Sequence, residues 1–179
     1  MEIVYHVVTE RPMQKGQVLF FDAGHPNGVR ARVDAFLRVK ENRRKCDALE
    51  DFVTRDLERW SRVAYRELAL EKVRREEFTQ YPSRMACLYT SRTLREAQDW
   101  AKFFRDIGCE PYSIVRLGVE GRVFSADACL CFDGVEDETE NLAPARSYWR
   151  RDAGGERLVI ETLVDGRIEV LEIIEEYRK

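Results

Sequence analysis

Glu161 is the residue whose place in the sequence says most about chemistry. It alternates with Val159 and Leu163 in an apolar segment, so it shares one face of an expected strand with them. A carboxylate is costly to bury without a partner, so Glu161 must be paired with a cation or line a cleft. In the first case Arg157 or another arginine would neutralise it. In the second case it would stabilise positive charge that develops on a bound substrate.

Histidine and cysteine positions offer little support for a metal centre or a nucleophile. His6 and His25 lie far in sequence from Cys129 and Cys131, and alternate residues of a strand face opposite ways. We therefore expect no metal site. The odd number of 5 cysteines favours free thiols in a reducing compartment. No segment matches the glycine-rich dinucleotide loop, the phosphate-binding P-loop, the GxSxG elbow or the HExxH zinc motif.

Length and charge set the class of protein. The chain has 179 residues, with 30 Lys and Arg against 33 Asp and Glu, for a net charge of −3. This length supports one buried core, so we expect a single domain over residues 1–179. No apolar run approaches the roughly 20 residues of a membrane span, so no membrane association is expected. The start lacks a basic leader followed by an apolar stretch, which predicts a cytoplasmic protein.

Two strands and a helical insertion are expected in the first half of the chain. β-Branched and aromatic residues predict strands at 3–9 and 17–21, and an amphipathic helix follows at 29–37. Apolar residues then recur at threes and fours from Leu49 to Leu70, which predicts one long helix of about 30 residues. The helical insertion therefore spans about residues 29–80.

The second half of the chain is expected to be mostly strands. A strand at 85–90 precedes a helix that opens with the capping-box pair Thr93 and Glu96. Short strands separated by Gly and Asp follow at 112–117, 121–124 and 128–132, and the acidic segment 133–141 is an expected loop. A hairpin with an Asp165-Gly166 turn closes the chain, its strands at 158–164 and 167–174. The order of elements predicts an α+β fold.

Three segments far apart in the chain carry His, Tyr and Glu in that order. They are Val4-Tyr5-His6, then Leu88-Tyr89-Thr90-Ser91 with the helix after it, and the segment 161–171, which begins with Glu161. Together they resemble the three motifs of the ADP-ribosyltransferase superfamily, in the branch that uses His, Tyr and Glu, as in poly(ADP-ribose) polymerases and diphtheria-type toxins. The Gly that usually follows the His of that family is Val7 here. The resemblance implies a split, mostly antiparallel sheet with a long helical insertion.

The same resemblance implies NAD as the substrate and Glu161 as the catalytic carboxylate. Breaking the bond between nicotinamide and ribose develops an oxocarbenium-like positive charge, which a nearby carboxylate stabilises. Glu169 is the second candidate for this role, because a closing hairpin would present either residue. Tyr89 would stack on the nicotinamide ring.

The remaining implied contacts hold the dinucleotide. His6 would hydrogen-bond the adenosine ribose with support from Ser91, and Arg84 would pair with the pyrophosphate. Each of these residues also has a structural explanation. A strand histidine is often satisfied by the backbone, and Tyr89 taken alone is better explained as a core residue.

Most of the chain also resembles a family of uncharacterised bacterial proteins. They open with Tyr-His-Val-Val-Thr and carry Asn27-Gly28-Val29 and Pro82-Ser83-Arg84 in the same order. That resemblance implies one integrated fold and no particular activity.

The expected function is transfer of ADP-ribose from NAD to a macromolecule, protein or nucleic acid, or hydrolysis of NAD. One alternative is a non-catalytic binding or regulatory module with the same fold, which would meet a protein partner through its long helix. Another is an enzyme similar to RNA 2′-phosphotransferases. The transferase requires His6, Tyr89 and Glu161 to converge on one pocket. An arginine pair at Glu161 that leaves no cleft would favour the binding module.

Overall fold

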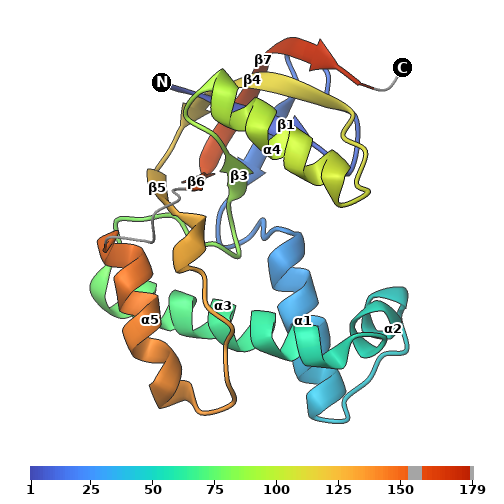
Figure 1. Ribbon diagram of the computed structural model, residues 1–179, viewed down its shortest axis with the longest axis vertical. Helices are drawn as coiled ribbons and strands as arrows, with labels where there is room; N and C mark the ends of the chain where they lie inside the picture. The colour runs from blue at the N-terminus through green and yellow to red at the C-terminus, as the bar shows by residue number, and fades with distance from the viewer. Residues whose placement is uncertain (153–158, 178–179) are drawn as a thin grey trace.

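Two antiparallel β-sheets form one half of the molecule, and most of the helices form the other (Figure 1). The computed structural model describes residues 1–152 and 159–177. One sheet has four strands in the order β1-β4-β7-β2, and the other has three in the order β3-β6-β5. The strands are β1 (Glu2–Val8), β2 (Val18–Phe21), β3 (Leu88–Thr90), β4 (Ser113–Glu120), β5 (Val123–Asp127), β6 (Ile160–Val164) and β7 (Gly166–Glu176).

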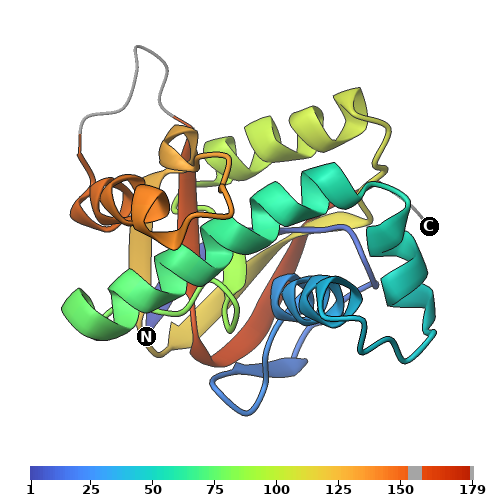
Figure 2. The same cartoon turned by 90° about the horizontal axis from the view of Figure 1, so that it is seen from below.

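The helices fall into a layer below the sheets and one helix beside them. The described helices are α1 (Gly28–Lys40), α2 (Ala48–Thr54), α3 (Leu57–Glu77), α4 (Leu94–Asp106) and α5 (Glu138–Arg150), with a short 3-10 turn, η1 (Ala128–Leu130). Seen from below, α3 crosses the molecule with α5 on one side and α1 and α2 on the other (Figure 2). Helix α4 packs against β1 and β4 instead. The expected α+β class is confirmed.

The two sheets meet where β1 passes the end of β3. The backbone N–H of Tyr5 donates to the carbonyl of Ser91 over 2.9 Å, and the N–H of Ser91 donates back to the carbonyl of Tyr5 over 2.8 Å. This pair of bonds joins the edge strand of one sheet to the end of the other. It brings the residue after Tyr5, His6, next to the strand that carries Tyr89.

The single long helix expected from about 49 to 80 is instead two helices. Helix α2 ends at Thr54, and α3 begins at Leu57. Asp56 lies outside the helical conformation, with φ −141° and ψ 64°, and its side chain accepts the backbone N–H of Arg59. An aspartate that caps a new helix interrupts the old one, although the apolar spacing continues through the break. Helix α1 agrees with the expected helix at 29–37 and extends it slightly.

The expected closing hairpin is wrong in its pairing. Strand β6 pairs with β3 and β5, whereas β7 pairs with β4 and β2, so the chain changes sheets at Asp165-Gly166. The Asp165 carboxylate accepts the backbone N–H of Arg122 over 2.8 Å and its Nε over 2.9 Å. These bonds hold the crossing to the β4–β5 turn. The first residue of the expected hairpin, Leu158, lies outside the described residues.

Two further expectations fail around the acidic segment. Residues 128–132 do not form a strand, because the Asp127 carboxylate accepts the N–H of Cys129 over 2.9 Å and bends the chain into η1. Helix α5 was not expected at all. It begins at Glu138, inside the segment assigned to a loop, and contains Pro144. Acidic residues in the first turn stabilise a helix, but a run of acidic residues in a sequence is also typical of a solvated loop.

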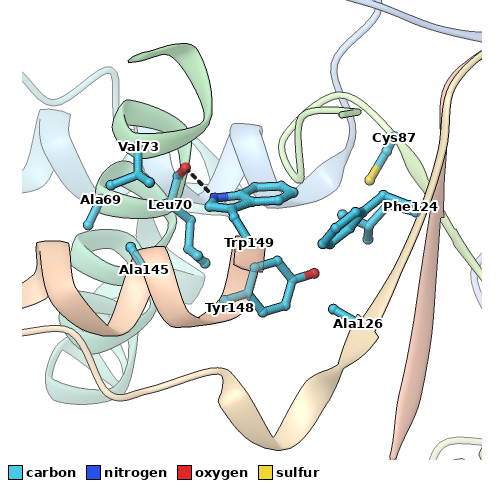
Figure 3. Packing of buried hydrophobic residues seen from close by; sticks show 10 residues of the cluster. Ala69, Leu70, Val73, Cys87, Phe124, Ala126, Ala145, Tyr148 and Trp149 are labelled. Atoms are coloured by element: carbon cyan, nitrogen blue, oxygen red, sulfur yellow. Dashed lines mark hydrogen bonds between the residues drawn. The ribbon is translucent and has the colours of Figure 1, made fainter. Parts of the chain in front are cut away.

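The face of the second sheet that carries Tyr89 and Glu161 lies against α3 and α5. In the core between them, Trp149 donates from Nε1 to the carbonyl of Leu70 over 2.8 Å, and Tyr148 and Phe124 pack beside it (Figure 3). Trp149 therefore has a packing role in the core. None of the described helices is both long and apolar enough to cross a bilayer.

Candidate functional site

His6 and Tyr89 are joined by a direct hydrogen bond. His6 lies on β1, and its Nδ1 is 2.8 Å from the carbonyl oxygen of Tyr89 on β3. A carbonyl only accepts, so Nδ1 carries the proton and Nε2 has a lone pair when the ring is neutral. Desolvation lowers the pKa of His6, which keeps the ring neutral near pH 7. No described residue hydrogen-bonds Nε2.

Tyr89 is half-buried, and its side chain is held by a hydrogen bond at its hydroxyl and by a contact at its ring. Its hydroxyl donates to the carbonyl of Arg84 over 3.0 Å, and the Arg84 guanidinium carbon lies 5.3 Å from its ring centre. Burial raises the pKa of Tyr89 well above its usual value, so the phenol stays protonated. The ring is therefore fixed next to a guanidinium.

Glu161 is held by one of its two oxygen atoms. It lies on β6 with its side chain 10% exposed, and its Oε1 accepts from the Arg84 guanidinium and from the Tyr148 hydroxyl, the latter over 2.8 Å. The Cys131 thiol lies 3.8 Å from the same oxygen. Burial raises the pKa of Cys131 to about 12, so this sulfur keeps its proton and can donate. No described residue donates to Oε2.

Arg84 is the centre of this cluster, and it is buried. Its Nε donates to Glu67 over 2.9 Å and its Nη1 donates to the Tyr148 hydroxyl over 2.7 Å as well as to Glu161. Burial alone would lower the pKa of Arg84, but Glu161 and Glu67 raise it well above the usual value. Glu67 in turn accepts from Arg66 over 3.0 Å. Two arginines thus balance two carboxylates.

Contacts therefore link His6 to Tyr89, Tyr89 to Arg84 and Arg84 to Glu161, whereas no contact among the described residues joins His6 to Glu161. Ser91 is buried and contacts the cluster only through its backbone bonds to Tyr5. Glu169 is elsewhere, on β7 in the other sheet, where it accepts from Arg167 over 2.9 Å. The cation that neutralises Glu161 is Arg84, and Arg157 lies outside the described residues.

The short segments 27–29 and 82–84 contact each other. The Asn27 side chain donates to the carbonyls of Arg84 and Cys87, each over 2.8 Å. Its amide oxygen accepts from Val29 over 3.0 Å and from Arg30 over 3.3 Å, which caps α1. One asparagine therefore ties the start of the helical layer to the loop that presents Arg84.

Three members of the cluster were missed by sequence reasoning: Glu67, Tyr148 and Cys131. The sequence does indicate a paired carboxylate at Glu67. This residue falls between Ala64 and Leu70 in the apolar stripe of α3, where a carboxylate needs a cation. The sequence gives no such indication for Tyr148, because this residue lies on α5, a helix that the sequence did not predict.

Two hollows lie elsewhere on the surface. One of about 300 Å³ separates α1 from α3, and one of about 470 Å³ lies at the start of α3 beside Asp133. Neither is lined by His6, Tyr89 or Glu161. Within residues 1–152 and 159–177, no three His, Cys, Asp or Glu side chains are grouped to hold a metal ion.

The cluster thus offers a neutral imidazole, an aromatic face and a carboxylate with one oxygen lacking a donor among the described residues. His6 and Tyr89 each keep part of their surface exposed, whereas Arg84 and Glu161 are buried. The arginine pair at Glu161 is present as well, and it neutralises the carboxylate.

Comparison with known proteins identifies a family. No curated protein matches the chain. Residues 4–176 match the model of a family described as a protein of unknown function, DUF2441, and because the match covers nearly all of its length, the chain belongs to that family.

Proposed function

We propose that this chain is an NAD-dependent ADP-ribosyltransferase acting on a macromolecule, protein or nucleic acid, or an NAD glycohydrolase when water is the acceptor. His6, Tyr89 and Glu161 are linked by contacts, the last two through Arg84, and this observation carries the proposal. These residues come from three strands, and 83 positions separate His6 from Tyr89. The resemblance to the His-Tyr-Glu branch implies the same three residues for the site.

The chemistry fits the groups that are present. The bond between the nicotinamide nitrogen and ribose C1′ breaks, and its electron pair leaves with nicotinamide. Glu161 stabilises the oxocarbenium-like charge left on the ribose by its fixed negative charge. The acceptor atom then bonds to C1′ and loses its proton to solvent. One NAD and one acceptor thus give the ADP-ribosylated acceptor, nicotinamide and a proton.

His6 and Tyr89 hold the dinucleotide in this proposal. A neutral His6 accepts a hydrogen bond from a ribose hydroxyl at Nε2, because Nδ1 is used on the Tyr89 carbonyl. Tyr89 offers an aromatic face to the nicotinamide ring, and its own hydroxyl is anchored on Arg84. Both side chains are therefore fixed before NAD arrives.

NAD binding is the first test, because it needs no acceptor. We expect calorimetry to detect NAD binding by the wild type, and Tyr89→Ala to weaken it up to about tenfold through loss of ring stacking. Tyr89→Phe keeps the ring and removes only the bond to Arg84, so it serves as the matched variant. It should bind NAD nearly as well as the wild type.

Nicotinamide release is the second test. Glu161→Gln should lower release at least about 100-fold, because the charge that faces the oxocarbenium is lost. Glu169→Gln removes a carboxylate from the other sheet and should leave release unchanged. Equal effects of the two substitutions would contradict the role of Glu161.

A non-catalytic binding or regulatory module is the second candidate, and the buried ion pair between Arg84 and Glu161 favours it. Such a pair is what a purely structural carboxylate needs. This candidate predicts no heat of NAD binding in the wild type, with the variants indistinguishable from it. The calorimetry therefore separates the two candidates directly.

A further inference from the structure

Each guanidinium nitrogen of Arg84 already faces a protein partner. Nε and Nη2 are directed at Glu67, over 2.9 and 3.4 Å, and Nη1 is shared by the Tyr148 hydroxyl and Glu161. The group also lies 5.3 Å from the ring centre of Tyr89 and 4.9 Å from that of Tyr148. A pyrophosphate would have to displace two buried carboxylates to reach it.

The backbone of Arg84 is fixed as firmly as its side chain. Its carbonyl accepts from the Asn27 amide over 2.8 Å and from the Tyr89 hydroxyl over 3.0 Å. A residue held at its carbonyl and at each guanidinium nitrogen is poorly suited to swing toward a ligand. It is well suited to hold another side chain still.

Tyr148 links Arg84 to Glu161 through one hydroxyl. That oxygen accepts from Arg84 over 2.7 Å and donates to Glu161 Oε1 over 2.8 Å. Burial raises the pKa of Tyr148 well above its usual value, so the phenol keeps the proton that it donates. Both donors act on Oε1, and no described residue donates to Oε2.

The geometry points to Arg84 and Tyr148 as positioning residues that fix Glu161 through Oε1 and leave Oε2 for the substrate ribose. Arg84 is then the internal counter-ion of Glu161 rather than a pyrophosphate ligand. This inference rests on the proposed function, since it assigns the ion pair a part in the same reaction.

Tyr148→Phe is the sharpest test, because it removes one hydroxyl and keeps the ring against Phe124 and Trp149. We expect the kcat of nicotinamide release to fall about tenfold with the KM for NAD unchanged, as for one lost hydrogen bond to a charged group. Tyr81→Phe is the matched control. Tyr81 stacks in the same aromatic cluster, but its hydroxyl accepts only from Arg151 over 3.4 Å.

Arg84→Lys separates positioning from phosphate binding. It keeps the positive charge but loses the fork that reaches Glu67 and Glu161 together. A positioning role predicts a lower kcat at constant KM, whereas a phosphate ligand predicts a KM raised about tenfold or more. The second result would overturn the inference.

The remaining outcomes are also decisive. If the wild type is active and Tyr148→Phe matches Tyr81→Phe in kcat, the positioning role is wrong and the proposed function survives. If the wild type releases no nicotinamide with water, lysate protein or RNA as acceptor, the proposed function fails and the inference falls with it.

Discussion

Arg84 sets the charge balance of the cluster, because it pairs with Glu67 on one side and with Glu161 on the other. The sequence predicts that Glu161 needs a cation or a cleft, and it separately nominates Arg84 as a phosphate ligand. The structure joins these two residues and adds Glu67 on the other side. Sequence reasoning could not separate the two roles of Arg84, because a guanidinium pairs with carboxylates and phosphates through the same fork. Only the positions of Glu67 and Tyr148 decide between them.

His6 should make the stability of the fold depend on pH near neutrality. Its pKa is lowered from 6.5 by desolvation, so the folded state resists protonation of the ring. The stability it contributes is complete above pH 6.5 and is lost as the pH falls through 6.5 toward the lower folded value. Urea unfolding at about pH 7.5 and about pH 5.5 should show a loss of up to about 1.4 kcal/mol from this residue.

The matched variants for this prediction are His6→Gln and His25→Gln. Glutamine at position 6 does not titrate, so the loss between the two pH values should shrink. His25 is exposed and pairs with Asp22 in its own loop, so His25→Gln controls for the loss of a surface histidine. A His6→Gln variant that loses as much stability as the wild type would show that other groups cause the effect.

Among the elements, the loop that presents Arg84 depends on Asn27. Asn27→Asp keeps an oxygen that can cap α1 but replaces the amide that donates to the carbonyls of Arg84 and Cys87. We expect the free energy of unfolding to fall by about 2–3 kcal/mol, for two lost hydrogen bonds and the carbonyls left facing an oxygen. Hydrogen exchange should accelerate at the amide of Ala86, which donates to Ser83 in this loop.

Asn27→Ala is the companion variant, because it removes the cap as well as the loop bonds. It should accelerate exchange both in the loop and in the first turn of α1, whereas Asn27→Asp should accelerate only the loop. Equal acceleration of the α1 turn in both variants would mean that the carboxylate does not replace the cap.

A helix or strand is predicted correctly when neighbouring residues in the sequence determine it, and less well when distant contacts determine it. The capping box of α4 is encoded by Thr93 and Glu96 within one turn, and the structure forms both of its bonds. The break between α2 and α3 also has a local cause, Asp56, but an apolar stripe that runs past it hides the interruption. Helix α5 contains Pro144, which opposes a helix, and packing of Tyr148 and Trp149 in the core decides otherwise.

Across the whole molecule, pairing between distant strands was the least predictable feature. Contacts link His6 to Tyr89 and Arg84 to Glu161, yet the segment that carries Glu161 does not form the expected closing hairpin. An Asp-Gly pair between two strands is compatible with a tight turn or with a change of sheet. The choice depends on Arg122 and Glu120, which are far away in the sequence and contact this crossing only in the fold.

Gly166 is therefore the residue on which the change of sheet depends, and Gly16 provides a matched comparison. Both are left-handed, with φ +80° and +81°, so alanine at either position costs about 1 kcal/mol in backbone strain. A side chain at Gly16 would meet nothing within 4 Å, whereas one at Gly166 would lie 2.4 Å from the carbonyl oxygen of Glu120. We expect Gly166→Ala to lower the free energy of unfolding by more than about 3 kcal/mol in urea, against about 1 kcal/mol for Gly16→Ala. Gly166 is the first residue of β7, and only Asp165 separates it from β6, which carries Glu161, so this loss should also weaken the NAD binding that we propose. Equal losses at the two glycines would mean that the crossing yields easily and does not hold the two sheets in register.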